Sequence, residues 1–528
     1  MSRSRGLAWN VFSNWTGYAV QVAVTFFLTP LVVGSLGDAR YGVWILISGL
    51  TGYYGLLDLG FRAGLTQYLT RHLATKQYDK LNQTASTGFV ALACCGLLIL
   101  LATVLLSWFA PHMFRLAAEH AREFSFCLII VGLAIGIQFC FFPFSSVLVA
   151  TERFDIVNGI GICTRVLSAV ALVQVLKIDH SLLGISLITA GSNVLDYGLR
   201  CVAAYRLVPQ LQIRPHIASV ASAREFMSFG AWNVVINGSA RLISYTHAVI
   251  IGLFMPAAAI APFALAASLR NYFNEMFAPI GQVFFPTAAR LDAQGDNDGL
   301  RRLYLNVSRL LLCLVVSGAV VAFIYSEDFF RLWVPVFFID TGPYPSPALL
   351  FRILLVAAVC LSGQRIGYQV LLGTHRVSVL ARLFVAEGIL NVVLCICLIP
   401  WFGLIGVALG TLIPSCIFHG VIQPYVIARA LDVTWRGYFR QVLLKPLVVG
   451  AALGPAVYAI HSMVAITNWG LLVAHGFATA LLALALIVVI GLSAEERNRF
   501  LLRPLEKFTR RRQPADGSPL IEKTTSAP

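Results

Sequence analysis

The sequence predicts an all-α polytopic membrane protein of about fourteen transmembrane helices. These are expected to form two six-helix lobes, related by a pseudo-two-fold axis along the membrane normal, plus two extra C-terminal helices. Hydrophobic residues make up 58% and charged residues 12% of the 528 residues, against roughly 45–50% and 25% in soluble domains. Mean hydropathy is +0.79. Mostly apolar runs recur from Leu7 to Leu492, and each is long enough to cross a hydrocarbon core of about 30 Å as a helix.

Polar breaks between the apolar runs define the individual spans. The first run is too long for the h-region of a cleavable signal peptide, so we expect it to remain in the mature protein. The predicted spans lie near 7–33, 41–70, 83–108, 126–149, 156–176, 182–199, 228–254, 260–286, 303–325, 348–372, 377–400, 403–428, 441–463 and 469–493.

The distribution of Lys and Arg predicts the orientation, because cytoplasmic loops retain these residues. With the N-terminus inside, 25 of the 39 Lys and Arg residues fall in inner segments and five in outer loops. This predicts a multi-pass protein of the bacterial inner membrane with both termini in the cytoplasm. The net charge of +15 then reflects topology, so we expect membrane lipids as partners and no nucleic acid. The basic tail should contact anionic lipid.

Two short matches indicate an internal repeat. Residues 9–14 recur at 232–237 with four of six positions identical, and Arg71, Ala74, Asp79 and Leu81 match Arg290, Ala293, Asp298 and Leu300. Six helices per copy is an even number, so both copies enter the membrane from the same side, as in transporters built from parallel repeats. The predicted units are an N-lobe (1–215), a C-lobe (216–435), two further helices (436–494) and a basic cytoplasmic tail (495–528).

Residues 27–68 carry a family resemblance. The stretches Thr29-Pro30-Leu31, Leu36-Gly37, Tyr41-Gly42-Val43-Trp44 and Leu57-Asp58-Leu59-Gly60-Phe61 resemble the opening of the Wzx-type polysaccharide (O-antigen and exopolysaccharide) flippases of the MOP superfamily. The resemblance implies two lobes around a central cavity, alternating access and a lipid-linked oligosaccharide as cargo. It also suggests the polysaccharide polymerase machinery as a candidate partner.

Nine arginine and lysine residues fall within the predicted spans, and three of them, Arg165, Arg241 and Arg270, lie roughly 14–20 Å into their helices. A charge at that depth costs at least about 2.5–3.5 kcal/mol unless it faces water or a partner. A guanidinium binds phosphate oxygens in bidentate fashion. We therefore expect Arg241 and Arg270 to hold the diphosphate, with Arg62 and Arg165 as supporting charges. The alternative is that each arginine pairs with a carboxylate and locks helices together.

The carboxylates within the spans have competing interpretations. Asp58 and Arg62 stand at i, i+4, the spacing of an intrahelical ion pair. Glu387 and Asp196 could carry protons or sodium if transport is ion-coupled, although pairing with a neighbouring arginine is the favoured interpretation. Apart from H⁺ or Na⁺, no cofactor is expected. The eleven cysteines lack the loop spacing of a zinc or disulfide site and are interpreted as small hydrophobic residues.

Three other functions remain as alternatives. A flippase of a lipid-linked peptidoglycan precursor would share the fold and a cationic cavity. A MATE-like drug or cation exporter would share twelve helices, but its cavity should be acidic to attract cations. A membrane-embedded glycan polymerase or ligase would be an enzyme with a sizeable outer loop. The predicted outer loops are short, and no nucleotide-binding motif or nucleophile with a nearby base is present, so we expect a transporter rather than an enzyme.

Overall fold

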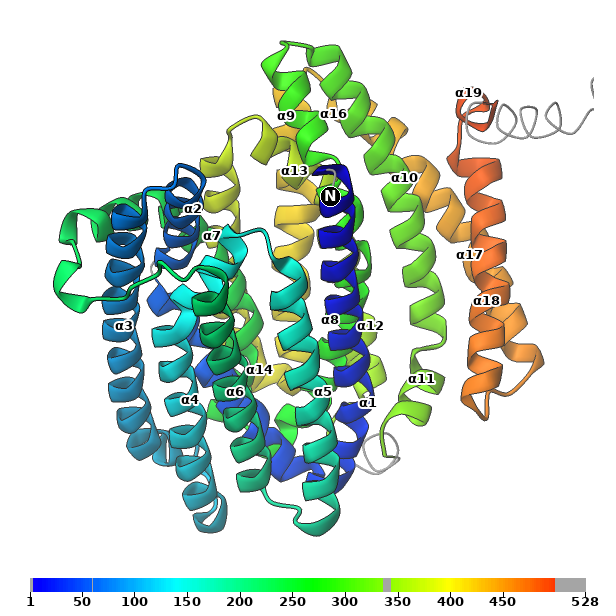
Figure 1. Ribbon diagram of the computed structural model, residues 1–528. Helices are drawn as coiled ribbons and strands as arrows, with labels where there is room; N and C mark the ends of the chain where they lie inside the picture. The colour runs from blue at the N-terminus through cyan, green and yellow to red at the C-terminus, as the bar shows by residue number, and fades with distance from the viewer. Residues whose placement is uncertain (1–2, 59, 336–342, 499–528) are drawn as a thin grey trace, which may run out of the picture.

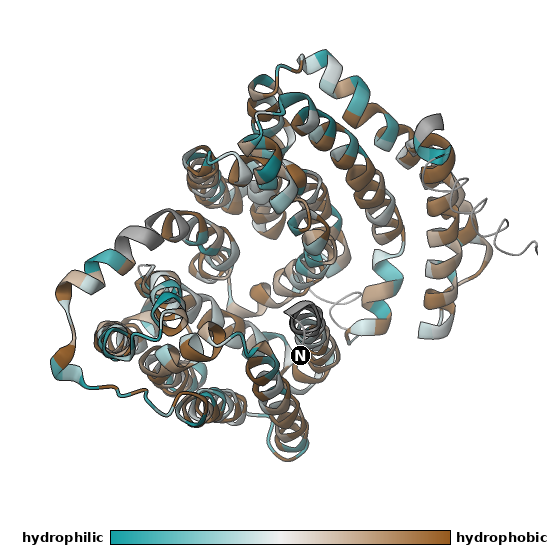
Figure 2. Cartoon of the chain, turned by 45° about the horizontal axis from the view of Figure 1, so that its top comes forward, coloured by the Kyte–Doolittle hydropathy of each residue, from teal (hydrophilic) through white to brown (hydrophobic). Residues whose placement is uncertain are grey.

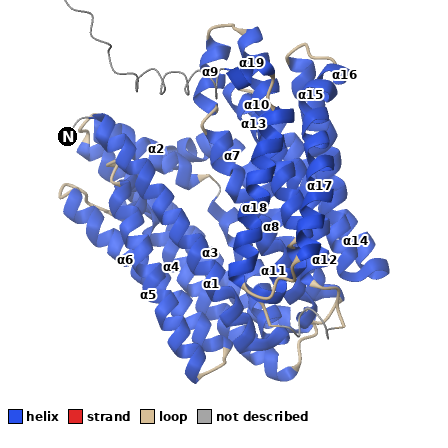
Figure 3. Ribbon diagram, turned by 90° about the vertical axis from the view of Figure 1, so that its right-hand side faces the viewer, coloured by secondary structure: helices blue, strands red, loops and turns tan. Residues whose placement is uncertain are grey.

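The computed structural model describes residues 3–58, 60–335 and 343–498, and these ranges contain helices and no strand (Figure 3). The first part of the chain forms α1 (Arg3–Gly52), η1 (Tyr53–Asp58), α2 (Phe61–Ala74), α3 (Tyr78–Met113), α4 (Ala118–Ala150), α5 (Phe154–Ile178) and α6 (Leu182–Leu207). The middle forms η2 (Pro215–Ile217), α7 (Val220–Phe254), η3 (Ala257–Ala259), α8 (Ile260–Gln282), α9 (Phe285–Ala293), α10 (Asn297–Ile324) and α11 (Ser326–Trp333). The last part forms α12 (Pro347–Gly363), α13 (Arg365–Gly373), α14 (Val377–Ser415), η5 (Cys416–Ile422), α15 (Gln423–Ala430), α16 (Trp435–Tyr438), η6 (Phe439–Leu443), α17 (Leu444–Met463), α18 (Trp469–Leu486), η7 (Ile487–Gly491) and α19 (Ala494–Arg497). Of the predicted tail, only 495–498 is described.

The described helices supply about fourteen membrane-spanning legs, in agreement with the sequence. Eleven segments of the described chain are long and apolar enough to span a bilayer. Two of these, Trp15–Asp58 and Val377–Ala430, fold back and supply two legs each. The pair α8 and α9 supplies one more leg, which is less apolar because α8 carries Arg270, Asn271, Asn274 and Glu275.

Glycine makes both reversals possible. A straight helix of 50 residues would be about 75 Å long, more than twice the thickness of a bilayer core. Gly37 breaks α1 at φ 73°, and Gly403 breaks α14 at φ 56°, conformations that favour glycine over residues with a β-carbon. Each long element is therefore two antiparallel legs joined by a tight turn. In Figure 1 the first leg of α1 descends from the N-terminal end of the chain and the second leg returns towards α2.

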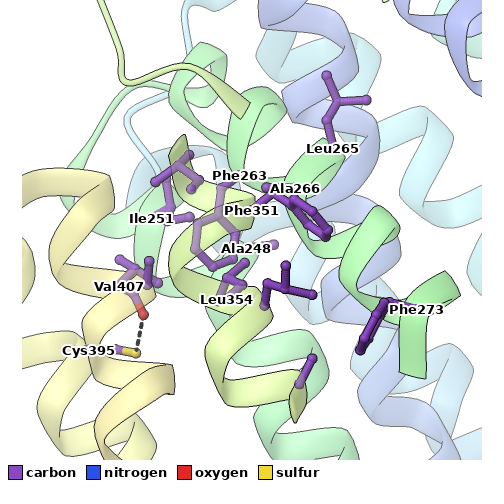
Figure 4. Packing of buried hydrophobic residues seen from close by; sticks show 14 of the residues in the cluster. Ala248, Ile251, Phe263, Leu265, Ala266, Phe273, Phe351, Leu354, Cys395 and Val407 are labelled. Carbon is purple, nitrogen blue, oxygen red and sulfur yellow. Dashed lines mark hydrogen bonds between the residues drawn. The ribbon is translucent and has the colours of Figure 1, made fainter. Parts of the chain in front are cut away.

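The helices form two groups, seen side by side in Figure 2. In the first group α4 packs against α3 and α6, and α5 packs against α1 and α6. In the second group α7 packs against α14, α8 against α12, and α10 against α17. The centre of the second group is apolar: Phe263, Phe351 and Val407 lie together, and the Cys395 thiol donates to the Val407 carbonyl at 3.5 Å (Figure 4). The domain boundaries given above stay a prediction.

Helix α7 also contacts the first group, against the second leg of α1, η1 and α2. Glycines allow this close approach. A β-carbon at Gly42 would overlap the Ala257 carbonyl oxygen, and one at Gly64 would lie 2.6 Å from the Phe226 backbone. The backbones of the two groups of helices are therefore in close contact near both ends of α7.

The last two membrane legs are attached to the second group. Helix α17 packs against α10, and the Arg309 guanidinium of α10 pairs with Glu496 of α19 at 2.5 Å. Both side chains are largely buried. The Lys445 ammonium donates to the Gly491 carbonyl at 3.3 Å. Because Glu496 follows the final leg, this ion pair holds the end of that leg against the second group.

Candidate functional site

A cavity of about 410 Å³ lies within the second group of helices. Its wall comes from α7, α8, α12, α13, α14, η5 and α15, and its polar side chains include Arg270, Glu275, Gln364, Arg365, His419 and Gln423. A volume of this size is typical of small-molecule sites, which range over roughly 300–1,000 Å³. We call it the C-lobe cavity.

Arginines outnumber carboxylates on the wall of the C-lobe cavity. The Arg270 guanidinium donates to the Asn271 side chain at 2.9 Å, and that of Arg365 donates to the Asn274 carbonyl at 2.7 Å. The Nε atoms of both arginines are buried without a hydrogen-bond partner in the described chain. Glu275 is the acidic lining residue. The wall therefore offers unused guanidinium donors, which suit an anionic ligand.

Glu387 lies behind this wall and is almost fully buried. Its carboxylate accepts from Ser415 at 3.0 Å and is 2.8 Å from His419 Nε2. His419 stands in η5, a π-helical turn of the kind often found at functional sites. The pairing of Glu387 with an arginine, favoured from the sequence, is thus replaced by a direct contact with histidine, because His419 is brought alongside it by the α14 hairpin.

A second, smaller cavity of about 210 Å³ lies between α7 and the broken helix formed by η1 and α2. Asp58, Asn237 and Arg241 line it. We call it the seam cavity. The Arg241 guanidinium donates to the Gly52 carbonyl at 2.9 Å, where α1 ends and its last carbonyls lack helical partners. Arg241 therefore joins the two groups of helices and faces a cavity. Asn237 also lines the C-lobe cavity, so the two cavities meet at α7.

Arg62 does not line the seam cavity. Its guanidinium lies over two rings of α4, 4.2 Å from the centre of Phe139 and 4.3 Å from that of Phe142. It also pairs with Asp58 at 3.8 Å, and the Arg62 amide donates to the same carboxylate at 3.0 Å. The i, i+4 pairing predicted from the sequence is confirmed, and Asp58 additionally satisfies an amide at the start of α2.

Arg165 and Asp196 lie in the first group. Asp196 pairs with Arg200 at 2.7 Å and accepts from Thr164 at 3.2 Å. The predicted span ended at 199 and so left this partner in a loop, whereas α6 continues to Leu207. The predicted pairing of Asp196 with a neighbouring arginine is confirmed. Arg165 lines neither the C-lobe cavity nor the seam cavity.

A lateral groove connects the C-lobe cavity with the outer surface of the helix bundle. It lies between the first leg of α1 and α8, where Trp15 and Tyr18 face Pro279 and Val283. Glu275, Ala278 and Gln282 line both this groove and the cavity. A ligand in the cavity could therefore extend sideways towards lipid.

The same two helices are closed together at the other end. The Phe26 ring of α1 stacks on Trp333 at 5.5 Å, with Tyr272, Phe329 and Trp469 around it. Trp333 Nε1 donates to the Phe26 carbonyl at 3.0 Å. That carbonyl lacks its usual helical partner because residue 30 is proline and has no N–H. Aromatic packing thus joins α1, α8 and α11 at this end.

The carboxamides of the C-lobe cavity were not predicted as site residues from the sequence. Seven of its lining residues are Asn or Gln: Asn237, Asn271, Asn274, Gln282, Gln364, Gln369 and Gln423. Asn and Gln residues within apolar spans were the feature of the sequence that could have indicated this polar wall. Of these residues, Asn237 lines both cavities.

Comparison with known proteins gives one family match. Residues 36–334, more than half of the chain, match a family described as polysaccharide biosynthesis protein. The uncharacterized membrane protein EpsK of Bacillus subtilis (strain 168) is 21% identical over 513 residues, covering 94% of this chain and 97% of that protein. A putative O-antigen transporter of Shigella flexneri is 22% identical over 335 residues, covering 63% of this chain and 77% of that protein.

Solved structures share the fold. The lipid II flippase MurJ in an inward closed conformation aligns with a TM-score of 0.66 and 11% identity, over 91% of this chain and 98% of that chain. An inward-facing multidrug resistance MATE family transporter of the MOP superfamily aligns with a TM-score of 0.63 and 12% identity, over 78% and 95%. At these identities the likeness shows the fold alone.

Proposed function

Because the chain belongs to the polysaccharide biosynthesis protein family, we propose that it flips a polyprenyl-diphosphate-linked oligosaccharide. The direction is from the cytoplasmic to the outer leaflet of the bacterial inner membrane, with both termini in the cytoplasm. Transport proceeds by alternating access of a central site, without chemistry on the substrate. The cargo then supplies surface polysaccharide biosynthesis, and the polymerase machinery is the expected recipient.

One observation carries this proposal: an arginine-bearing cavity within the helix bundle shares its lining with a lateral groove between α1 and α8. A lipid-linked anion needs both features, because its diphosphate must leave water while its hydrocarbon chain stays in the bilayer. Each guanidinium placed at this depth is costly unless an anion or water meets it. Arg270 and Arg365 line the cavity, and the lateral groove gives the chain a path outwards.

We propose that the diphosphate binds where the two cavities meet. Arg241 lines the seam cavity, Arg270 lines the C-lobe cavity, and Asn237 is common to both. Guanidinium groups approaching from two sides could bind the two phosphates in bidentate fashion. Arg62, turned towards α4, would support this site by its charge alone. The supporting role of Arg165 stays a prediction, since its side chain belongs to neither cavity wall.

The rival transport functions differ in the ligand they require. A cation exporter needs an acidic cavity, which the arginines of the C-lobe cavity disfavour. A peptidoglycan precursor flippase needs the same charge and fold, so it differs in the sugar alone. A glycan polymerase or ligase needs reactive groups on an outer segment. In α11 the carboxylates Glu327 and Asp328 are engaged with Arg331 and His461.

The proposal is tested with purified protein in vesicles. A short-chain polyprenyl-diphosphate-linked N-acetylglucosamine is placed in the outer leaflet, and a lectin added outside reports the fraction that has moved inwards. We expect protein-containing vesicles to hide the lipid from the lectin many times faster than protein-free vesicles. Equal rates, together with active export of ethidium by the same vesicles, would replace this function with cation export.

Ion coupling is assigned to Glu387 rather than to Asp196. Asp196 is bound to Arg200 within α6, whereas Glu387 contacts His419, a residue of the cavity wall. We expect Glu387→Gln to abolish the acceleration of flipping by an imposed proton or sodium gradient, while a slow gradient-independent rate remains. Vesicles with and without each gradient provide the measurement. An undiminished response to both gradients in the variant would remove Glu387 from the coupling mechanism.

A further inference from the structure

The part of the C-lobe cavity lined by Gln364, Gln369 and Gln423, called here the inner C-lobe cavity, is polar but carries little charge. Gln364 and Gln423 are 5% and 2% exposed, and Gln369 lies beside them on the wall. Burying a carboxamide is costly unless its donor and acceptor are satisfied. A group of such side chains in the membrane region therefore calls for a ligand or water that can both donate and accept.

Gln364 has an unused acceptor. Its amide nitrogen donates to the Tyr438 hydroxyl at 3.0 Å, while its Oε1 atom is buried and has no hydrogen-bond partner among the residues described. Gln423 is held in place, because its carbonyl oxygen is 2.7 Å from His419 Nδ1 and its nitrogen is 3.4 Å from the Gln364 backbone oxygen. Gly367 allows close packing here, because a β-carbon at this position would lie 2.5 Å from Ile427 Cδ1 and 3.1 Å from Gln364 Oε1.

Two aromatic rings stand on the same wall. Tyr368 and Phe384 meet edge to face at 6.1 Å, and Phe384 meets the His419 ring at 5.5 Å. All three residues line the cavity. Ring faces of this kind pack well against the apolar C–H face of a sugar ring, while carboxamides bond its hydroxyl edge.

The two parts of the site suit different chemical groups. A phosphate oxygen only accepts, so it is matched by arginine donors and opposed by the Gln364 oxygen. A hydroxyl group both donates and accepts, so it can use that oxygen and the neighbouring amides. We propose that the inner C-lobe cavity is a glycan subsite, which binds the neutral sugar ring attached to the diphosphate, with Gln364 as a specificity-determining acceptor. This inference rests on the function proposed above.

Binding measurements on the purified full-length protein separate the two proposals. The probes are farnesyl diphosphate and its glucose, galactose and N-acetylglucosamine derivatives. We expect the wild type to bind at least one glycosylated probe about tenfold more tightly than farnesyl diphosphate, since the sugar satisfies a buried acceptor. In Gln364→Met that preference should disappear, while the affinity for farnesyl diphosphate stays within twofold.

The matched control is Gln138→Met. Gln138 donates to the Tyr197 hydroxyl at 3.0 Å in the first group of helices, an equivalent bond away from both cavities, so the sugar preference should survive. Tyr368→Ala, which removes the ring beneath the sugar, provides a second test if Gln364→Met unfolds in thermal scans. The glycan subsite is overturned if the wild type binds all four probes equally, or if the cavity variants keep the preference. Failure to bind any diphosphate probe would instead contradict the proposed function itself.

Discussion

Arg270→Gln is expected to slow flipping of the lipid-linked sugar about 100-fold and to leave folding nearly unchanged. Hydrogen bonds to a charged partner contribute about 1.5–3 kcal/mol, and the upper part of that range corresponds to roughly two factors of ten in rate. The guanidinium has one bond to the described protein, to the Asn271 side chain. Arg270→Gln removes a positive charge that acts on Glu387, but Glu387 keeps its contacts with Ser415 and His419, so the variant should still fold.

The matched control for Arg270 is Arg382→Gln. Arg382 is an exposed arginine of α14 that bonds to the Ser378 carbonyl at 3.3 Å and lines neither cavity. The same vesicle assay measures both variants, after gel filtration and thermal unfolding have shown that each is folded. Equal flipping rates for folded Arg270→Gln and wild type would show that the diphosphate does not use this guanidinium.

Gly42→Ala is expected to disturb the contact between the two groups of helices and to lower stability by about 1–3 kcal/mol, the usual cost of inserting a methyl group into a filled space. The added β-carbon would overlap the carbonyl oxygen of Ala257. A backbone oxygen cannot rotate away as a side chain does, so the second leg of α1 must move from η3. Thermal unfolding in detergent measures the loss.

Gly159→Ala on α5 is the control for Gly42→Ala. No atom lies within 4 Å of a β-carbon built at Gly159, and alanine favours helix over glycine by up to about 1 kcal/mol. This variant should therefore be as stable as the wild type or slightly more so. If the two substitutions change the unfolding temperature alike, the close approach between α1 and η3 does not contribute to stability.

The family and the number of crossings could be predicted from the sequence because both depend on local pattern. The spans follow from apolar runs of bilayer length, and the motifs between Thr29 and Phe61 are contiguous; the family match and the MurJ-like fold confirm that interpretation. The reversal at Gly37 falls between two predicted spans, and Gly403 is the first residue of the span predicted at 403–428.

The arrangement of the site could not be predicted, because it depends on which helix faces touch. Arg62 and Arg241 belong to helices that meet at the seam, yet one guanidinium packs on α4 and the other bonds to the Gly52 carbonyl. The contact between Glu387 and His419 arises from a hairpin and a π-helical turn. The predicted span ended at residue 199, eight residues before the observed end of α6 at Leu207. Arg200 was therefore not recognised as a partner of Asp196 on the same helix.

The bond from Trp333 to the Phe26 carbonyl has a consequence for alternating access. Since Pro30 leaves that oxygen free, separating α1 from α11 removes no hydrogen bond from the α1 ladder, and water can take the place of the indole. The net loss is one bond of about 0.5–1.5 kcal/mol plus some ring contacts. The contact between Phe26 and Trp333 can therefore open and close at a small cost in free energy. Substitution of single aromatic residues around it would change that cost in small steps.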